Sequence, residues 1–203
     1  MSIIIGLTGP TGSGKSTASR AAAEYGFKWV DCDILAHRAV EKGTSGLEAL
    51  VRAFGGGILC ADGSLNRKKL AAAAFKDKAG TELLNQTVLP FVAELVKLEC
   101  KGGNVLLDAP TLFESGIAPL CTKTVAVLAD REIRLKRITA RDGITADEAE
   151  LRISAGKGDG FYLHKADYIL YNNNGEEEFL TQFNKIMTEI TGGNLYAGNK
   201  ISG

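Results

Sequence analysis

Near its start the chain carries the stretch Gly9-Pro10-Thr11-Gly12-Ser13-Gly14-Lys15-Ser16, which matches the pattern GxxxxGK(S/T) at every fixed position. The apolar run Ile3–Leu7 before it predicts a buried strand, and the run Lys15–Tyr25, stopping at Gly26, predicts a helix. A glycine loop between a strand and a helix turns backbone N–H groups and the positive helix end toward phosphate. The stretch therefore predicts a binding site for a nucleoside triphosphate.

Two side chains of this loop have defined tasks in phosphoryl transfer. Lys15 is expected to place its charge between the β- and γ-phosphates, and the hydroxyl of Ser16 is expected to ligate Mg²⁺. A chance glycine turn is the alternative, but the strand, loop and helix all lie in register with the motif. The loop does not identify the second substrate.

The composition is that of an ordinary globular protein. Of 203 residues, 45% are apolar and 24% are charged, enough for one core with a smaller appended lobe. Basic and acidic residues balance at 24 each, which argues against broad nucleic-acid binding. The N-terminal apolar run is too short for a membrane span or signal peptide, so a cytoplasmic protein is expected. The cysteines are irregularly spaced and are expected to be free thiols: Cys32, Cys60, Cys100 and Cys121.

The order of elements predicts an α/β protein with a parallel sheet. Compact apolar runs typical of strands covered on both faces recur along the chain: Phe27–Val30, Val105–Leu107, Thr124–Leu128 and Tyr168–Tyr171. Helical stretches lie between them, as in successive βαβ units. The expected fold is the three-layer fold of P-loop NTPases, with residues 1–33, 104–135 and 166–203 forming the nucleotide-binding core.

Two excursions interrupt this core. Residues 34–103 show helix signals without a convincing strand and predict a helical substrate-binding insertion. Residues 136–165 are basic and contain Gly156-Lys157-Gly158-Asp159-Gly160, a loose segment suited to a lid.

Local signals add detail to these excursions. Ser45 with Glu48, and Thr145 with Glu148, have the spacing of capping boxes. Pro90 is expected to break or kink the long helical pattern 81–101.

Acidic residues follow two of the predicted strands, at the edge of the sheet where ligands bind. Asp33 is expected to orient or deprotonate a hydroxyl that attacks the γ-phosphate, although it has the alternative of capping the helix 34–42. Asp31 is a weaker candidate. Asp108 ends a strand in a Walker-B-like pattern and is expected to reach Mg²⁺, with the capping of a turn as its alternative.

Arginines form a stripe on the helix that leads into the predicted lid. Arg134, Arg137 and Arg141 share one face, and Arg137 and Arg141 are expected to bind or stabilise the transferring phosphoryl group. Arg152 is a further candidate on the next helix. A solvated charged face is the alternative. His37 and His164 have no catalytic partner in sequence, and Trp29 is expected to pack.

Several segments together resemble the dephospho-CoA kinase family over about residues 1–175. They occur in the family's order: IGLTGPTGSGKST, VDCDILAHRAV, FGGGIL, DGSLNRKKLAAAAF, LDAPTLFESG, RLKRITARDGITADEAELRI and KADYILYNNNG. Many kinases share the first segment, whereas the combination with the LNRKKL, DAPTLFE and KADYILYN segments is more specific. The resemblance implies a P-loop core, a helical substrate domain and a lid, which use ATP and Mg²⁺ to phosphorylate the ribose 3′-hydroxyl of dephospho-CoA.

The resemblance also implies roles by position. It places the ATP phosphates on Gly12, Ser13, Gly14, Lys15, Ser16 and Thr17. It puts Asp33 opposite the acceptor hydroxyl, Arg67 in the substrate lobe, Asn172 at the nucleotide base and Arg137 and Arg141 in the lid.

This chain departs from the family pattern at a few positions. Leu89 stands before Pro90 where His is usual, Gly156 stands where Gln is frequent, and Pro110-Thr111-Leu112 replaces the usual Pro-Leu-Leu.

Two other functions remain open at the level of sequence. A shikimate- or gluconate-type kinase would suit the pair Asp31 and Asp33, but such kinases use a smaller acceptor lobe than residues 34–103. A nucleotide-dependent switch of the GTPase type would need Asn-Lys-x-Asp, and Asn184-Lys185-Ile186-Met187 lacks the final Asp. The expected partners are small molecules, with no nucleic acid and no membrane, and the expected state is a monomer or weak homo-oligomer.

Overall fold

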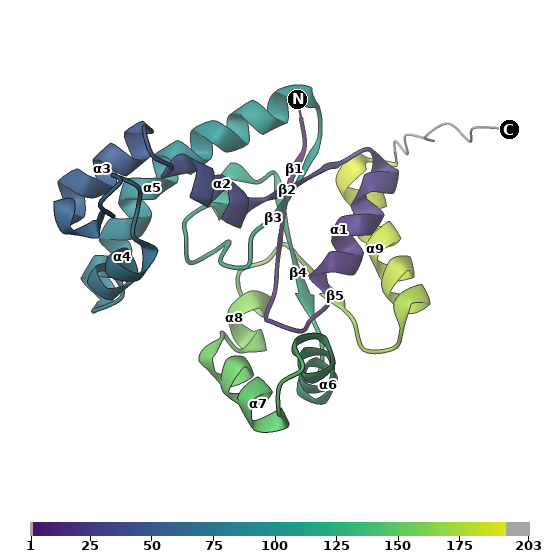
Figure 1. Ribbon diagram of the computed structural model, residues 1–203. Coiled ribbons are helices and arrows are strands. Elements are labelled where there is room, and N and C mark those ends of the chain that lie inside the picture. The colour runs from purple at the N-terminus through teal and green to yellow at the C-terminus, as the bar shows by residue number, and fades with distance from the viewer. Residues whose placement is uncertain (1, 194–203) are drawn as a thin grey trace, which may run out of the picture.

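The core is a five-stranded parallel sheet, seen in a computed structural model that describes residues 2–193 (Figure 1). The strands lie in the order β2-β3-β1-β4-β5, and every neighbouring pair is parallel. Their bounds are β1 (Ile4–Thr8), β2 (Lys28–Asp31), β3 (Val105–Asp108), β4 (Lys123–Leu128) and β5 (Tyr168–Tyr171). The predicted α/β class and parallel sheet are confirmed, with strand ends that differ from the prediction by one residue at most.

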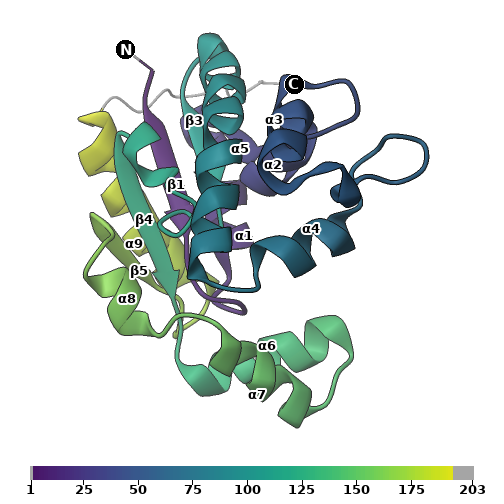
Figure 2. The same ribbon diagram turned by 90° about the vertical axis from the view of Figure 1, so that its left-hand side faces the viewer.

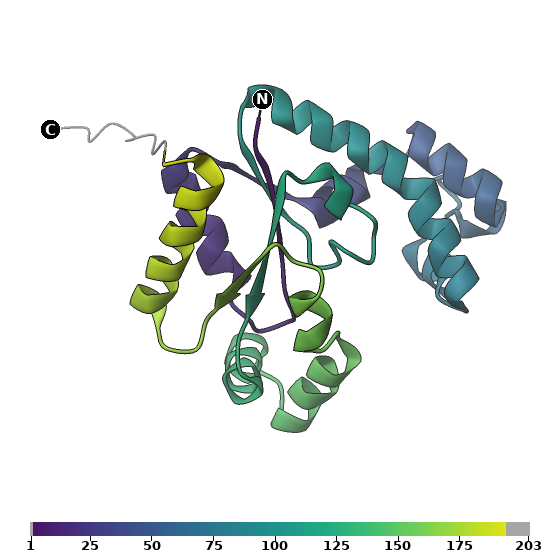
Figure 3. The same ribbon diagram turned by 180° about the vertical axis from the view of Figure 1, so that it is seen from behind.

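Helices cover both faces of the sheet and explain why its strands are apolar throughout. On one face, α1 (Lys15–Ala22) and α9 (Glu176–Thr191) pack over Leu106, and on the other face Val105 and Leu107 meet the helices of the insertion. Figures 1 and 3 show α1 and α9 together on one side of the strands. The result is the three-layer arrangement expected from the sequence.

The insertion between β2 and β3 is helical, as predicted. It contains α2 (Cys32–Ala39), α3 (Ser45–Phe54), α4 (Arg67–Ala74) and α5 (Lys78–Glu99). Between residues 32 and 102 the pairing of extended chain is limited to one bridge, Leu59 with Leu65. Four short 3₁₀ turns complete the connections of the described chain: Ala23–Tyr25, Gly56–Ile58, Cys100–Gly102 and Ala118–Leu120.

Of two local predictions about the insertion, the first is wrong, and the helix break expected in the second does not occur. The N-cap of α3 is Thr44, whose hydroxyl accepts the N–H of Leu47 at 3.2 Å, so the capping box expected at Ser45 and Glu48 does not form. Helix α5 runs unbroken through Pro90. Helices α2, α3 and α4 all pack against α5, so tertiary contacts outweigh the local cost of the proline.

The predicted lid segment contains α6 (Arg131–Asp142), α7 (Ala146–Ala155) and α8 (Asp159–Leu163). Helices α6 and α7 form a hairpin with its own small core of Ile138, Ala149 and Ile153, and α7 begins with the predicted capping box of Thr145 and Glu148. Figure 2 shows this hairpin below the sheet, facing α4. Helix α8 instead packs on the sheet, because Tyr162 lies against Ala126 and Leu128.

The remaining sequence expectations concern cysteines and membranes. All four cysteines are free thiols, as expected. Within residues 2–193, each helix is too short or too polar to span a bilayer.

Phe183 provides a test of the core on the α1–α9 side. Its ring is 1% exposed and meets the ring of Tyr25 edge-on, with 6.1 Å between centroids. Phe183→Ala should lower the free energy of unfolding by about 3–5 kcal/mol, because it removes a buried ring and leaves a cavity. Phe75, which is 64% exposed, is the control, and Phe75→Ala should change stability by less than about 0.5 kcal/mol. Urea titrations that gave equal losses would contradict this packing.

Candidate functional site

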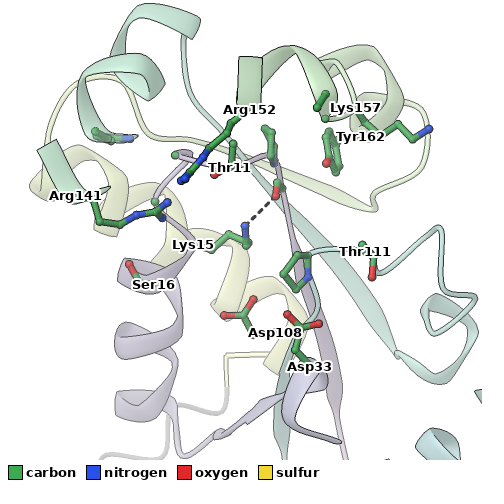
Figure 4. A pocket seen from close by; sticks show the side chains of 18 of the residues that line it. Thr11, Lys15, Ser16, Asp33, Asp108, Thr111, Arg141, Arg152, Lys157 and Tyr162 are labelled. Carbon is green, nitrogen blue, oxygen red and sulfur yellow. Dashed lines mark hydrogen bonds between the residues drawn. The ribbon is translucent and has the colours of Figure 1, made fainter. Parts of the chain in front are cut away.

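The register of the parallel strands brings the candidate residues to one edge of the sheet. Leu7 of β1 lies opposite Asp108 of β3, and Asp108 lies opposite Asp31 of β2. The glycine loop that follows β1 therefore starts beside both carboxylates, at the carboxyl edge where ligands bind in open α/β sheets. A cavity of about 1110 Å³ opens there between the loop, the strand ends and the lid helices (Figure 4).

The loop adopts a conformation that requires glycine. Gly9, Gly12 and Gly14 have φ angles of 140°, 78° and 94°. A Cβ on Gly14 would lie 2.1 Å from the amide nitrogen of Asn172, so space as well as φ excludes a side chain. No side chain caps the start of α1, which leaves its first N–H groups directed at the loop for an anion.

Lys15 lies across the loop that it follows. Its Nζ donates to the carbonyl oxygen of Gly9 at 2.9 Å, as Figure 4 shows. Burial lowers the pKa of Lys15, while the nearby carboxylate of Asp108 raises it. Ser16, the next residue, lines the same cavity, so the two side chains predicted to serve phosphate and metal open onto one space. Ser13 and Thr17 are not among the residues that line it.

The two acids after β2 have different tasks. Asp31 is the N-cap of α2 and accepts the N–H groups of Asp33 and Ile34 at 2.8 and 3.2 Å. The alternative that Asp33 caps a helix is therefore wrong, because α2 begins earlier than predicted. Asp33 lies in the first turn and faces the cavity. Burial, and then the charge of Asp31, raise the pKa of Asp33, whereas His37 and Lys15 lower it.

One carboxylate oxygen of Asp108 has a hydrogen-bond partner, and the other has none. Its Oδ2 accepts the hydroxyl of Ser19 at 3.2 Å, and its buried Oδ1 has no hydrogen-bond partner. Burial raises the pKa of Asp108, and Lys15 lowers it. A hard oxygen ligand without a partner, in the cavity that Ser16 also lines, fits Mg²⁺. Among residues 2–193 no three His, Cys, Asp or Glu residues cluster as a metal cage.

The arginine stripe of α6, made of Arg134, Arg137 and Arg141, shares one helix face, but each of its members has a different partner. Arg134 is 5% exposed, and its Nε donates to the carbonyl of Thr11 at 2.9 Å. Arg137 donates to the carbonyl of Ser13 at 3.2 Å, and Arg141 forms a fork on Asp142. Arg137 and Arg141 both line the cavity. Arg137 is held on the loop by its bond to Ser13, whereas Arg141 is held on Asp142.

Asn172 lies behind the loop instead of in the cavity. It follows β5, is 6% exposed, and its amide donates to the carbonyl of Ser13 at 2.9 Å. Its Oδ1 and its backbone carbonyl each accept Arg137 Nη2 at 3.0 Å. The expected contact with the nucleotide base stays a prediction. The hydrogen bonds that Asn172 and Arg137 make to each other and to Ser13 could not be predicted from the sequence, because they join residues that are far apart along the chain.

The remaining candidates lie in or near a second cavity of about 380 Å³ among α2, α4 and α5. Arg67 and His37 lie at this cavity, Leu89 is part of its apolar wall, and Thr111 lines both cavities. Thus the helical insertion carries a hollow that meets the phosphate site at Thr111. Sequence reasoning missed this junction.

Two other sequence expectations have plain outcomes. The ring of His164 contacts the carbonyl of Gly160 at 2.6 Å, and this residue lines neither cavity. Trp29, expected to pack, is half exposed on the edge strand β2. Lys157 and Tyr162 line the phosphate cavity without having been predicted as site residues, although Lys157 lies within the glycine run that predicted a lid.

Comparisons with known proteins agree with the geometry. The family described as dephospho-CoA kinase matches residues 3–178. A dephospho-CoA kinase of Mycolicibacterium paratuberculosis is 42% identical over 189 residues, covering 91% of this chain and 46% of the relative. One from Listeria monocytogenes is 40% identical over 86% of this chain and 90% of its own length. The chain thus spans about half of the mycobacterial relative and most of the listerial one.

A solved structure supports the same assignment. The dephospho-CoA kinase from Campylobacter jejuni superposes with a TM-score of 0.62 at 27% identity, over 94% of this chain and 98% of the other. The family match and the superposition thus each cover most of the chain. The chain belongs to the dephospho-CoA kinase family, a family of ATP-dependent kinases.

Proposed function

We propose that this chain transfers the γ-phosphate of ATP to the ribose 3′-hydroxyl of dephospho-CoA, giving coenzyme A and ADP. The observation that carries the proposal is the junction of two cavities. One holds the phosphate loop and Asp33, and the other lies in the helical insertion, and Thr111 lines both. A long acceptor that reacts at one hydroxyl needs such a groove beside the phosphate site.

Asp33 is the proposed general base. The attacking oxygen forms a bond to the γ-phosphorus as the bond to the β–γ bridging oxygen breaks, and the hydroxyl proton passes to Asp33. Partial desolvation raises the pKa of this carboxyl, which makes it a better proton acceptor. Lys15 is proposed to leave the carbonyl of Gly9 and bind the β- and γ-phosphates.

Mg²⁺ is the proposed metal, held by Ser16 and by the spare oxygen of Asp108. When bound, it supplies positive charge to the phosphate oxygens. Gly12, Ser13, Gly14 and Thr17 are proposed to hold ATP through the loop backbone and the start of α1, with Asn172 close to the base.

The arginines of the lid are proposed to stabilise the charge that moves during transfer. Arg141 is exposed on the cavity and is suited to the γ-phosphate, while Arg137 both lines the cavity and braces Ser13. The proposed division keeps residues 34–103 as the substrate domain and 136–165 as the lid. Within that lid the hairpin α6–α7 is the part that closes, since α8 is packed on the sheet.

The second cavity is the proposed acceptor site. Its wall is largely apolar, with Leu84, Val88 and Leu89 on α5, and Arg67 adds a positive charge at the start of α4. Dephospho-CoA combines a pantetheine arm, whose methyl and methylene groups can pack on an apolar wall, with a charged diphosphate, which matches this pairing. The rest of the proposal is a cytoplasmic enzyme that acts on small molecules, as a monomer or weak homo-oligomer.

The first prediction concerns the reaction itself. With ATP, Mg²⁺ and dephospho-CoA the protein should form CoA, detected by mass, while shikimate and gluconate should not be phosphorylated. Lys15→Ala should reduce the rate by roughly 10²–10³, because one preorganised charge on the phosphates is lost. Phosphorylation of shikimate in preference to dephospho-CoA would overturn the assigned acceptor, and a folded Lys15→Ala variant with more than half the activity would overturn the assigned loop.

The second prediction separates base from cap. Asp33→Asn should lower kcat by roughly 10²–10⁴ and change the KM for ATP little, since proton transfer is lost while the phosphate loop remains. The acidic limb of the pH profile of kcat should vanish with it, because that limb reports protonation of Asp33. Asp31→Ala is the control and should cost about 1 kcal/mol of stability with a far smaller loss of kcat. The opposite pattern would make Asp31 the base.

The third prediction tests the acceptor site. Arg67→Ala should raise the KM for dephospho-CoA about tenfold or more, since a hydrogen bond to a charged group contributes roughly 1.5–3 kcal/mol. The KM for ATP should stay within about twofold, a difference of roughly 0.4 kcal/mol. Lys68→Ala, next on α4 and outside the cavity, should leave both constants unchanged. Equal effects from both variants would mean that α4 attracts the substrate only through its general charge.

A further inference from the structure

Asp142 holds two arginines that come from different helices of the lid. It is the last residue of α6, and its carboxylate accepts Arg141 Nε at 2.7 Å and Nη2 at 2.9 Å. The same carboxylate accepts Arg152 Nη1 of α7 at 2.5 Å. Asp142 thus joins the two guanidinium groups through one side chain.

Both arginines line the phosphate cavity, and Asp142 does not. Figure 4 shows the side chains of Arg141 and Arg152 directed to the space above Lys15. The fork on Asp142 uses two of the three nitrogens of Arg141 and leaves Nη1 for another partner. The carboxylate therefore lies behind the two arginines and determines where their remaining donors can point.

Electrostatics gives a reason for this arrangement. Two guanidinium groups aimed at one point repel each other, and each has several rotamers that lead away from the cavity. A single carboxylate between them offsets the repulsion and selects one rotamer for each. A carboxylate at the C-terminal end of a helix is itself unfavourable for the helix dipole, so helix stability alone does not explain Asp142. The hydrogen bond from Arg141 lowers the pKa of Asp142 and keeps it ionised.

We propose that Asp142 is a positioning residue for phosphoryl transfer, which orients Arg141 and Arg152 together toward the γ-phosphate. The inference rests on the proposed function and deepens it, since Asp142 touches no phosphate. It also assigns Arg152 a task beside Arg141, which sequence spacing does not indicate because the two lie on separate helices.

The lid contains a matched control for this inference. Arg131 of α6 forms an ion pair with Glu150 of α7, so this pair joins the same two helices. Neither residue lines the phosphate cavity. If Asp142 only held the hairpin together, loss of Glu150 would have the same consequence as loss of Asp142.

The experiment compares Asp142→Asn, Asp142→Glu and Glu150→Gln in the full chain. Asp142→Asn should lower kcat for CoA formation about tenfold or more, as expected when a reacting group's partner is misplaced by an ångström. Asp142→Glu should recover part of the loss, and Glu150→Gln should leave kcat within about twofold, while all three keep similar melting temperatures. Equal losses of kcat from Asp142→Asn and Glu150→Gln would overturn the proposal.

A double-mutant cycle tests the coupling directly. Arg152→Ala should lower kcat in the parent protein but have much less effect when Asp142 is already Asn, because both act through one geometry. Losses that simply multiply would contradict joint positioning.

A binding measurement keeps this test separate from the identity of the acceptor. If the parent protein forms no CoA, the proposed function fails, but calorimetry with ATP and ADP still tests Asp142. Asp142→Asn should reduce the preference for ATP over ADP at least about threefold, since the arginines that meet the third phosphate lose their alignment. Glu150→Gln should keep that preference, and an unchanged preference in Asp142→Asn would overturn the proposal.

Discussion

The site depends on a phosphate loop whose N–H groups can face inward only if its carbonyl groups find partners elsewhere. Because each peptide unit carries a donor and an acceptor, turning the amides toward an anion turns carbonyls toward the protein. Here the side chain of Arg134 donates to the carbonyl of Thr11. The side chains of Arg137 and Asn172 donate to the carbonyl of Ser13. Helix α6, which carries both arginines, therefore supports the loop through its carbonyl groups.

The same helix therefore contacts both the glycine loop and α7. The first turns of α6 are fixed on the loop through buried Arg134, while its last turn carries Arg141 and Asp142 into the hairpin with α7. Arg134 and Arg137 thus contact the loop, and Arg141, further along the same helix, lines the cavity. Between these two contacts α6 is one continuous helix.

Opposite charges allow several ionised groups to share one cavity. Lys15 lies near the carboxylates of Asp33 and Asp108. Desolvation raises the pKa of both acids, and the positive charge of Lys15 lowers it. In the hairpin of α6 and α7, the carboxylate of Asp142 likewise offsets the positive charges of Arg141 and Arg152. The second cavity is different, because most of the side chains that line it are apolar. Its basic side chains are Arg67 and His37. One end of the site is therefore charged and the other is largely apolar.

The sequence by itself determined the sheet, the helical insertion and the phosphate loop, because their signals are local: apolar runs, helix caps and a glycine pattern with a fixed spacing. It also marked Asp33 and Asp108 as the acids at the strand ends. Only the tertiary structure decided that Asp31 is the cap, that Pro90 does not break α5, and that Arg137 and Arg141 serve different partners. These outcomes depend on which segments pack together, since long-range contacts fix side-chain partners and overrule local preference.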